Sequence, residues 1–241
     1  MKMVYIGRNR KDVRYILIIL LLAMEGFILD QDDRYAAARG KMVIQQIISR
    51  GVDDQPTLQA MRKVPRHLFV PKEYQSEAYD DNPLPIGYGQ TISQPYIVAY
   101  MTEVAKPDPS KTALEIGTGS GYQAAVLAET VKKVYSIEIV PELARESAER
   151  LKKLGYDNIT VKYGDGYKGW KEFSPFDIII VTAAAEQIPQ PLIDQLAENG
   201  RLVIPVGPPM AVQELILLVK KNGKIEKSRL TFVRFVPFKR L

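Results

Sequence analysis

The sequence contains no cysteine and one histidine, His67, in 241 residues. The lack of cysteine excludes disulfide bonds, thiolate zinc sites, iron–sulfur clusters and a cysteine nucleophile. A Ser-His-Asp hydrolase would have to use His67, and a histidine-rich metal site cannot form, so we expect no bound metal. The chemistry must therefore come from carboxylates, hydroxyls, backbone groups or a cofactor.

The sequence also lacks a basic surface spread along its length. Its formal charge of +5 arises at the two ends: residues 1–14 hold five Lys or Arg against one Asp, and residues 220–241 hold eight against one Glu. The stretch between them is net acidic. Solvated basic ends are the simpler interpretation, and we expect no nucleic-acid partner.

No apolar run is long enough to cross a bilayer, which takes about twenty residues. Residues 16–24 (ILIILLLAM) follow a basic stretch and fit the core of a signal peptide. However, Glu25 interrupts the run, and the nearest small-residue pattern, Ala36-Ala37-Ala38, lies far downstream. An anchor, a helix packed on the domain and translation from an upstream start are alternatives. We set residues 1–30 apart as an extension and expect a cytoplasmic protein, with an exported or periplasmic one as the alternative.

Residues 31–110 predict a helical cap and a functional loop. Apolar residues at helical spacing run from Met42 to Ile48 and stop at Gly51, and a second helix is expected to begin near Pro56. Residues 74–95 are rich in Pro, Gly, Asp and Gln, and stretches of this kind in compact proteins are usually functional or disordered. The interleaved Ile, Leu and Tyr argue against disorder.

Residues 111–241 alternate strand and helix, which predicts a parallel sheet covered on both faces. Asn222-Gly223 then predicts a closing antiparallel hairpin. The expected fold is a Rossmann-like α/β domain with a seven-stranded sheet, five strands parallel. The expected strands are residues 112–116, 134–139, 159–163, 177–182, 201–206, 212–220 and 224–233, with helices at residues 122–130, 141–154 and 189–198.

A glycine-rich loop follows the first of these strands and opens a helix, the place where open α/β sheets bind nucleotides. The dinucleotide pattern GxGxxG would need glycine where Tyr122 stands, and the phosphate loop GxxxxGK[ST] is absent. Both departures favour a cofactor without a pyrophosphate at the loop. The loop residues that we expect to bind it are Glu115, Gly117, Thr118, Gly119, Ser120 and Gly121.

Two further carboxylates stand at the ends of the next strands. Glu138 can accept hydrogen bonds from ribose hydroxyls, as the equivalent acid does in dinucleotide-binding folds. Asp165, followed by Gly166, can accept from an exocyclic amine such as that of adenine. Each acid alone is more often a solvated loop residue, but acids at successive strand ends together predict a bound adenosyl group.

The sequence resembles class I S-adenosylmethionine-dependent methyltransferases in this loop, and protein-L-isoaspartate O-methyltransferases more closely. The closer resemblance rests on NPLPIG and GQTISQP within residues 82–95, on residues 115–121 and 164–166, and on FDIIIVTAA at residues 176–184. It implies methyl transfer from S-adenosyl-L-methionine to the free carboxylate of L-isoaspartyl, and some D-aspartyl, residues in damaged proteins. A carboxylate is already ionised at neutral pH, so no strong base is required.

The resemblance also implies a substrate site. Ser93 is expected to donate a hydrogen bond to the substrate carboxylate and orient it, while Thr91, Ile92 and Gln94 shape the pocket and the backbone near Val236 grips the peptide. For an arbitrary serine in a proline-rich loop, a turn-stabilising role would be the better interpretation. For Val236, an edge strand ending at a proline is equally consistent. His67 is expected to be structural, and Tyr122, Gln123 and Trp170 to belong to a helix start or the core.

Two other functions remain as alternatives. A class I methyltransferase acting on RNA or a small molecule would share the cofactor site, but would not explain GQTISQP. A non-catalytic nucleotide-fold binding protein would not bind the cofactor. We expect a monomer whose folded domain does not associate stably with membranes.

Overall fold

The computed structural model describes residues 35–209 and 211–241. Contacts divide the chain into two units, Met1–Ala38 and Arg39–Leu241, and the account below concerns the second. The extension expected at residues 1–30, with its apolar run, lies outside the described residues. The boundaries expected at residues 30 and 110 stay predictions.

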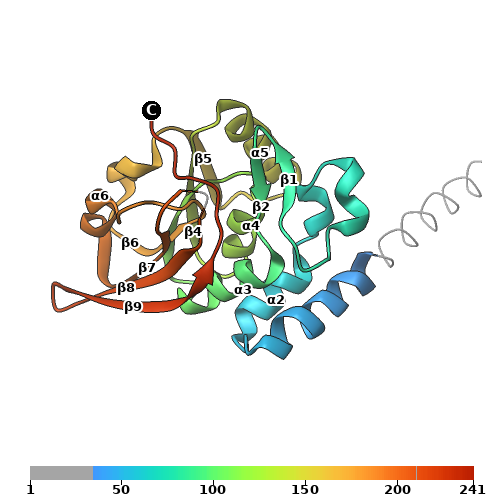
Figure 1. Cartoon of the computed structure of the whole chain (residues 1–241), viewed down its shortest axis with the longest axis horizontal. Coiled ribbons are helices and arrows are strands. Elements are labelled where there is room, and N and C mark those ends of the chain that lie inside the picture. The colour runs from blue at the N-terminus through green and yellow to red at the C-terminus, as the bar shows by residue number, and fades with distance from the viewer. Residues whose placement is uncertain (1–34, 210) are drawn as a thin grey trace, which may run out of the picture. The chain divides into compact units, whose positions relative to one another are not determined.

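Seven strands form the main sheet within the described part of the chain, in the order β5-β4-β3-β6-β7-β8-β9. The first five strands in sequence are parallel, whereas β8 runs antiparallel to both β7 and β9 (Figure 1). This order confirms the predicted fold class. The strands are β3 Thr112–Ile116, β4 Lys133–Glu138, β5 Ile159–Tyr163, β6 Phe176–Val181, β7 Leu196–Val206, β8 Gln213–Lys221 and β9 Lys224–Val233.

Helices connect the parallel strands. They are α4 Tyr122–Ala128, α5 Pro141–Lys153 and α6 Gln190–Asp194, with short 3-10 turns η5 Gly166–Lys168 and η6 Lys171–Phe173. The prediction of a helix over residues 189–198 was wrong at its carboxyl end. Leu196 already belongs to β7, where it is buried and pairs with Phe176 of β6. Pairing in the sheet therefore overrides helical spacing at this point.

The β8–β9 hairpin lies at one edge of the sheet, shown in red tones in Figure 1. Asn222 and Gly223 form its turn with φ values of 51° and 71°. Two successive positive φ values are the mark of a type I′ turn, whose twist matches that of the strands it joins. The predicted hairpin is thus confirmed, including its turn residues.

Short helices build the cap that precedes the sheet. Gly51, with φ of 90°, ends the first helical segment as predicted, and Asp54 caps α2 by accepting a 2.9 Å hydrogen bond from the Thr57 N–H. The cap elements are η1 Val43–Ile47, η2 Ile48–Arg50, α2 Gln55–Lys63, η3 Arg66–Phe69, η4 Lys72–Glu77 and α3 Pro95–Val104. The expectation of a helical cap is confirmed, although α3 was not predicted.

The proline-rich segment contains a small antiparallel hairpin that the sequence did not predict. Its strands are β1 Leu84–Gly87 and β2 Gln90–Ile92, joined by Tyr88 and Gly89 at φ values of 53° and 69°. Leu84 and Ile92 are paired and both buried, so the hairpin has its own inward face. The segment expected to be a functional loop is therefore a packed hairpin.

The core lies on both faces of the central strands, as expected for parallel strands covered by helices. In β6 every residue except Asp177 is buried. This rigid sheet fixes the carboxyl ends of β3, β4, β5 and β6 beside one another. Among the described residues, no helix has the length and apolar character needed to span a membrane.

Candidate active site

Three cavities lined by described residues meet at the carboxyl ends of the parallel strands. The largest has a volume of about 430 Å³ and lies between the β2–α3 junction and the end of β9. The other two, of about 60 and 30 Å³, lie on either side of the glycine-rich loop. Thr91 and Thr182 line all three. The site therefore has a wide groove connected to two narrow spaces at the loop.

The glycine-rich loop has a backbone that only glycine adopts easily. Gly117, Gly119 and Gly121 have φ values of 96°, 52° and 90°. A Cβ on Gly117 would stand 2.4 Å from the hydroxyl oxygen of Thr182, which donates a 2.7 Å hydrogen bond to the Gly117 carbonyl. Gly121 begins α4, whose free N–H groups point back to the loop. The loop thus closes tightly against β6 while leaving its outer surface open to a ligand.

Glu115 is completely buried beneath the loop, at the second-to-last position of β3. Its Oε2 accepts a hydrogen bond from the Ser136 hydroxyl, which lies 2.5 Å from the hydroxyl of Thr118. Its Oε1 is buried without a hydrogen-bond partner among the described residues. Burial raises the pKa of Glu115 to about 8, opposed by the Ser136 hydrogen bond and by the backbone N–H of Ala124, and helped by the nearby charge of Glu138.

Glu138 lies at the end of β4, buried, and fastens the glycine-rich loop to the neighbouring strand. Its Oε2 accepts from the Gly119 N–H at 2.7 Å, and its Oε1 accepts from the N–H groups of Ile139 and Val140 at 2.9 Å each. Oε1 thus uses both of its lone pairs, whereas Oε2 keeps one for a further donor. The carboxylate also lines the 60 Å³ cavity, where it can accept from hydroxyls of a ligand.

Asp165 follows β5, and the carboxyl-terminal tail reaches its carboxylate. Its Oδ1 accepts from the Tyr167 N–H at 3.0 Å, and its Oδ2 accepts from Nε of Arg240 at 3.0 Å. The guanidinium of Arg240 also stacks 3.6 Å from the centre of the Tyr167 ring. A Cβ on Gly166 would stand 2.3 Å from Cγ2 of Ile116, so glycine is required there. Asp165 is thus the contact point between the strand ends and the tail.

Ser93 connects the wide groove to the glycine-rich loop. It lies between β2 and α3, half-buried, and lines both the 430 Å³ cavity and the 30 Å³ cavity. Its hydroxyl forms no hydrogen bond with any described residue. Thr91 is exposed beside it, and the buried Ile92 side chain forms the floor. The Ser93 hydroxyl is therefore available to a ligand that reaches this junction.

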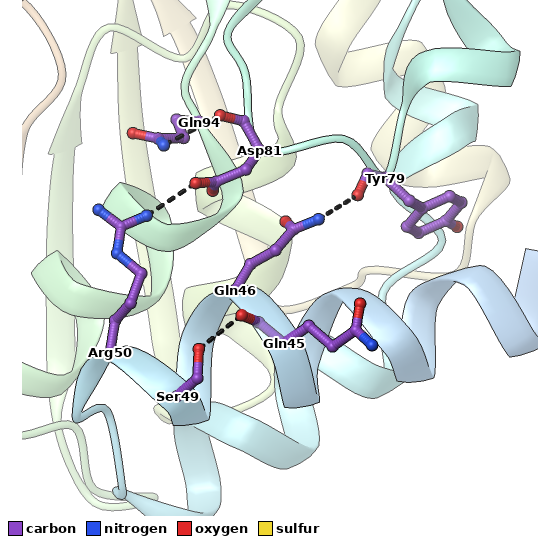
Figure 2. A network of polar contacts seen from close by, with 7 residues as sticks. All are labelled: Gln45, Gln46, Ser49, Arg50, Tyr79, Asp81 and Gln94. Atoms are coloured by element: carbon purple, nitrogen blue, oxygen red, sulfur yellow. Dashed lines mark hydrogen bonds and ion pairs between the residues drawn. The ribbon is translucent and has the colours of Figure 1, made fainter.

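The segment before Ser93 is fixed to the cap by a polar network. Gln94 donates a 3.0 Å hydrogen bond to the carbonyl of Asp81, whose carboxylate pairs with Arg50 at 2.7 Å. Figure 2 shows Arg50 and Gln46 reaching from the cap helices to this loop, where Gln46 donates to the Tyr79 carbonyl at 2.9 Å. The predicted substrate residue Gln94 is thus held in place through one of its two amide N–H donors.

Val236 lies where the tail crosses from the wide groove to the 60 Å³ cavity and lines both. Its carbonyl accepts a 2.8 Å hydrogen bond from the Ala184 N–H, and the Ala184 carbonyl accepts from the Phe238 N–H at 2.8 Å. These bonds hold the tail against the end of β6. The structure therefore brings Val236 to the same junction as Ser93 and Thr91.

Several residues of the site were not found from the sequence. Thr182 directly follows β6, and the rule that ligands bind at strand ends would have found it. Arg50 and Arg240 carry no such signal, and neither does Arg66, which lies in the cap and lines none of the three cavities. Arg66 is fully buried, donates to the Ala78 carbonyl at 2.8 Å and lies 4.8 Å from the Tyr122 ring, and burial lowers its pKa to about 10.

The residues expected to be structural lie as follows. His67 contacts the Tyr79 hydroxyl through Nδ1 at 2.7 Å and lines none of the three cavities. Tyr122 is buried against Phe69, and Trp170 packs edge-on against Tyr135. Tyr122 and Gln123 are the first two residues of α4 and both line the 30 Å³ cavity, and Gln123 donates to the Thr102 hydroxyl at 2.9 Å. Across the described part of the chain, no three His, Asp or Glu side chains gather as a metal site would require.

Comparison with known proteins gives a consistent set of relatives. A model of the protein-L-isoaspartate(D-aspartate) O-methyltransferase family matches residues 38–240. A protein-L-isoaspartate O-methyltransferase of Opitutus terrae is 59% identical over 202 residues, which cover 84% of this chain and 87% of that protein.

Two solved structures are also similar. A protein-L-isoaspartate O-methyltransferase has a TM-score of 0.76 at 31% identity, and the match covers 83% of this chain and 65% of that chain. A structure from Plasmodium falciparum, described as a protein-L-isoaspartate O-methyltransferase in complex with S-adenosyl-L-homocysteine, has a TM-score of 0.71 at 30% identity. This second match covers 86% of this chain and 99% of that one.

Proposed function

Because this chain belongs to the protein-L-isoaspartate(D-aspartate) O-methyltransferase family, we propose that it methylates the free carboxylate of L-isoaspartyl and D-aspartyl residues in damaged proteins. The methyl donor is S-adenosyl-L-methionine, in keeping with the product S-adenosyl-L-homocysteine bound to the relative from Plasmodium falciparum. The observation that carries the proposal is the position of Ser93, whose unpartnered hydroxyl lies between the glycine-rich loop and a groove wide enough for a peptide side chain.

The residues at the strand ends fit this cofactor. Glu115 offers a buried oxygen without a partner beneath the loop, and Gly119 presents its backbone to both small cavities. Glu138 and Asp165 offer acceptors at the ends of β4 and β5 for ribose hydroxyls and for the adenine amine. When bound, S-adenosyl-L-methionine supplies a methyl group on a positively charged sulfur, a good leaving system.

The protein's own contribution to the reaction is alignment. The substrate carboxylate is ionised at neutral pH, so no side chain has to remove a proton. Ser93 donates a hydrogen bond to one carboxylate oxygen and directs the other toward the loop, while the buried Ile92 side chain excludes water from the junction. Orientation of two reactants in a closed site accounts for a large part of many enzymatic rates.

The substrate backbone is proposed to lie along the tail at Val236. The Val236 carbonyl is already bonded to Ala184, but its N–H forms no hydrogen bond with any described residue. Val236 lines the same groove as Thr91 and Ser93. A peptide bound there would place the isoaspartyl carboxylate, which is bonded directly to Cα, at Ser93, whereas an ordinary aspartyl residue carries its carboxylate on a branch that is one methylene longer.

We further propose that the enzyme acts as a cytoplasmic monomer without a nucleic-acid partner. The basic ends of the sequence and the apolar run in residues 16–24 leave export and polyanion binding as the outcomes to test. Fractionation of tagged protein from intact cells and light scattering of the purified chain address these points separately from the activity.

The activity is tested with labelled S-adenosyl-L-methionine and two peptides that differ only in carrying L-isoaspartyl or L-aspartyl at one position. Label is expected in the isoaspartyl peptide alone, as a base-labile methyl ester. Equal labelling of both peptides, or of neither, would contradict the proposal. Labelling of RNA or a small molecule in place of the peptide would indicate another class I methyltransferase.

A further inference from the structure

The wall of the 430 Å³ groove carries positive charge only. Among its described lining residues, Arg50 and Arg234 are the charged ones, and none is Asp or Glu. Positive charge in the groove attracts the negatively charged carboxylate of the substrate. The proposed hydrogen bond from Ser93 holds that carboxylate without either arginine. The positive charge along the groove therefore affects the binding of the substrate residues that flank the isoaspartyl residue.

The two arginines differ in how far their charge is already compensated. Arg50 pairs with Asp81 at 2.7 Å, and its guanidinium lies 3.5 Å from the centre of the Tyr96 ring. Arg234 is exposed and forms no ion pair with any described residue. The nearby acid Glu214, on β8, is paired with Arg229 at 3.2 Å. Arg234 is consequently the uncompensated cation of the groove.

Arg234 stands at a fixed distance from the expected substrate backbone. It lies two residues before Val236, so their Cα atoms are at most about 7 Å apart along the chain. That distance spans about two residues of an extended peptide. It is also shorter than the screening length of about 8 to 10 Å at moderate salt, so a charge on a flanking substrate residue interacts with Arg234 without full screening.

We propose that Arg234 selects isoaspartyl segments whose flanking residues are acidic. This inference rests on the proposed function and names a substrate class for the same groove. Two opposite charges about 7 Å apart change binding roughly 3- to 7-fold for an effective dielectric constant between about 80 and 40. Isoaspartyl sites in acidic, exposed segments are then the preferred substrates, and sites flanked by lysine are the poorest.

The rim of the groove fits a peptide better than a polyanion with a uniform charge. Phe232 is 73% exposed and Val212 is 47% exposed, and both line the groove. A partner that contacts these side chains gains from burying apolar surface, about 25 cal/mol per Å². A peptide segment with both acidic and apolar side chains can interact with Arg234 and also cover Phe232 and Val212 at the rim.

The test uses three isoaspartyl peptides that carry Glu, Gln or Lys two residues from the isoaspartyl position on each side. In the unaltered chain, kcat/KM is expected to fall in the order Glu, Gln, Lys, with roughly 3- to 7-fold between Glu and Gln at low salt and less at high salt. Arg234→Gln is expected to reduce the Glu-to-Gln ratio to near one, and Arg234→Lys to retain it. Because each ratio compares two peptides on the same variant, a general change in the activity of that variant cancels.

The matched control is Lys227→Gln, which removes one exposed charge from β9 without touching the groove or the pair between Arg229 and Glu214. It is expected to leave the Glu-to-Gln ratio unchanged. A ratio near one in the unaltered chain, or one that Arg234→Gln does not alter, would overturn the inference while leaving the methyltransferase assignment standing. Failure to label any isoaspartyl peptide would instead overturn the assignment.

Binding can be followed without turnover, by fluorescence anisotropy of labelled peptides on the chain saturated with S-adenosyl-L-homocysteine. The same order of affinities is expected, with the same loss in Arg234→Gln. Single-stranded RNA serves as the competing polyanion. If RNA displaces the acidic peptide at equal concentration, the basic groove serves nucleic acid and the inference is wrong.

Discussion

At the scale of single residues, Ser93 has the most direct chemical role in the account. Its side chain is half-buried and without a hydrogen-bond partner among the described residues, at the meeting point of two cavities. A serine that stabilised its own turn would have its hydroxyl bonded to nearby backbone. The free hydroxyl is what an orienting group for an incoming carboxylate requires.

We expect Ser93→Ala to retain cofactor binding and to lose turnover. Misplacement of a reactant by about 1 Å can cost about 100-fold in rate, so kcat is expected to fall roughly 10- to 100-fold. The Kd for S-adenosyl-L-homocysteine should remain within about twofold, measured by calorimetry. Ser228→Ala, an exposed serine on β9, is the control. Unchanged turnover in Ser93→Ala would remove Ser93 from the mechanism.

Glu115 gives the protein a pH dependence of stability that follows from its burial. Its pKa is about 8 in the folded chain and near 4.5 when exposed. Between these values the folded state holds a proton that the unfolded state has lost. The free energy of unfolding therefore falls as pH rises through this window, by up to about 1.4 kcal/mol per pH unit, and levels off above about pH 8.

Glu115→Gln is expected to lose this part of the pH dependence. Urea denaturation at about pH 5.5 and about pH 8 should show a smaller loss of stability in the variant than in the unaltered chain. Glu226→Gln, an exposed carboxylate paired with Lys221, should change the slope little. Equal slopes for Glu115→Gln and the unaltered chain would show that Glu115 is ionised in the folded protein at neutral pH.

At the scale of elements, the carboxyl-terminal tail lines the cavity that we propose holds the cofactor. Val236, Pro237, Phe238 and Lys239 line the 60 Å³ cavity, and Arg240 bonds to Asp165 beyond it. Sites for ligands of this size usually have volumes of about 300 to 1,000 Å³. Displacement of the tail is therefore expected to accompany cofactor binding and release.

Arg240→Ala is expected to speed the release of S-adenosyl-L-homocysteine. The ion pair with Asp165 is half exposed on the arginine side, with 49% of that side chain accessible, so it contributes at most about 1 kcal/mol. The dissociation rate should rise about two- to fivefold in stopped-flow measurements. Lys239→Ala removes an equal charge from the same tail without breaking the pair. If both variants release the ligand alike, charge alone and not the pair is responsible.

The elements that the sequence predicted well are those whose signal is local. β3 and β5 have the predicted bounds because each is a short segment with strand-forming residues between turn signals, and the hairpin turn follows from Asn222-Gly223. The β1–β2 hairpin was missed because Pro83 and Pro85 argue against a strand. The end of α6 was missed because it depends on a pairing between β6 and β7 that spacing along the chain does not reveal.

The same distinction applies to the site. Glu115, Glu138 and Asp165 lie together because parallel strands end at one edge of the sheet, so an acid at each end is predictable from order alone. The partners of these acids are not. Arg240 meets Asp165 across 75 residues, and Arg50 meets Asp81 across 31. Such contacts depend on packing between separate elements, which leaves no periodic pattern in the sequence.

At the scale of the whole molecule, ligand binding and folding are linked. A ligand that binds only the folded state stabilises it by about 2.7 kcal/mol at 100 times its Kd. For a domain of about 200 residues, each kcal/mol raises Tm by about 2 to 4 °C. S-adenosyl-L-homocysteine at that excess is therefore expected to raise Tm by about 5 to 11 °C. No shift would indicate a non-catalytic protein with the same fold.

The whole-molecule account is tested most directly by a crystal structure of the chain with S-adenosyl-L-homocysteine and an isoaspartyl peptide. We expect the adenosyl group at the ends of β4 and β5, contacting Glu138 and Asp165, and the sulfur facing Ser93. The isoaspartyl carboxylate should accept a hydrogen bond from the Ser93 hydroxyl, with the peptide backbone beside Val236. A cofactor bound away from the glycine-rich loop, or a carboxylate that does not reach Ser93, would contradict the account.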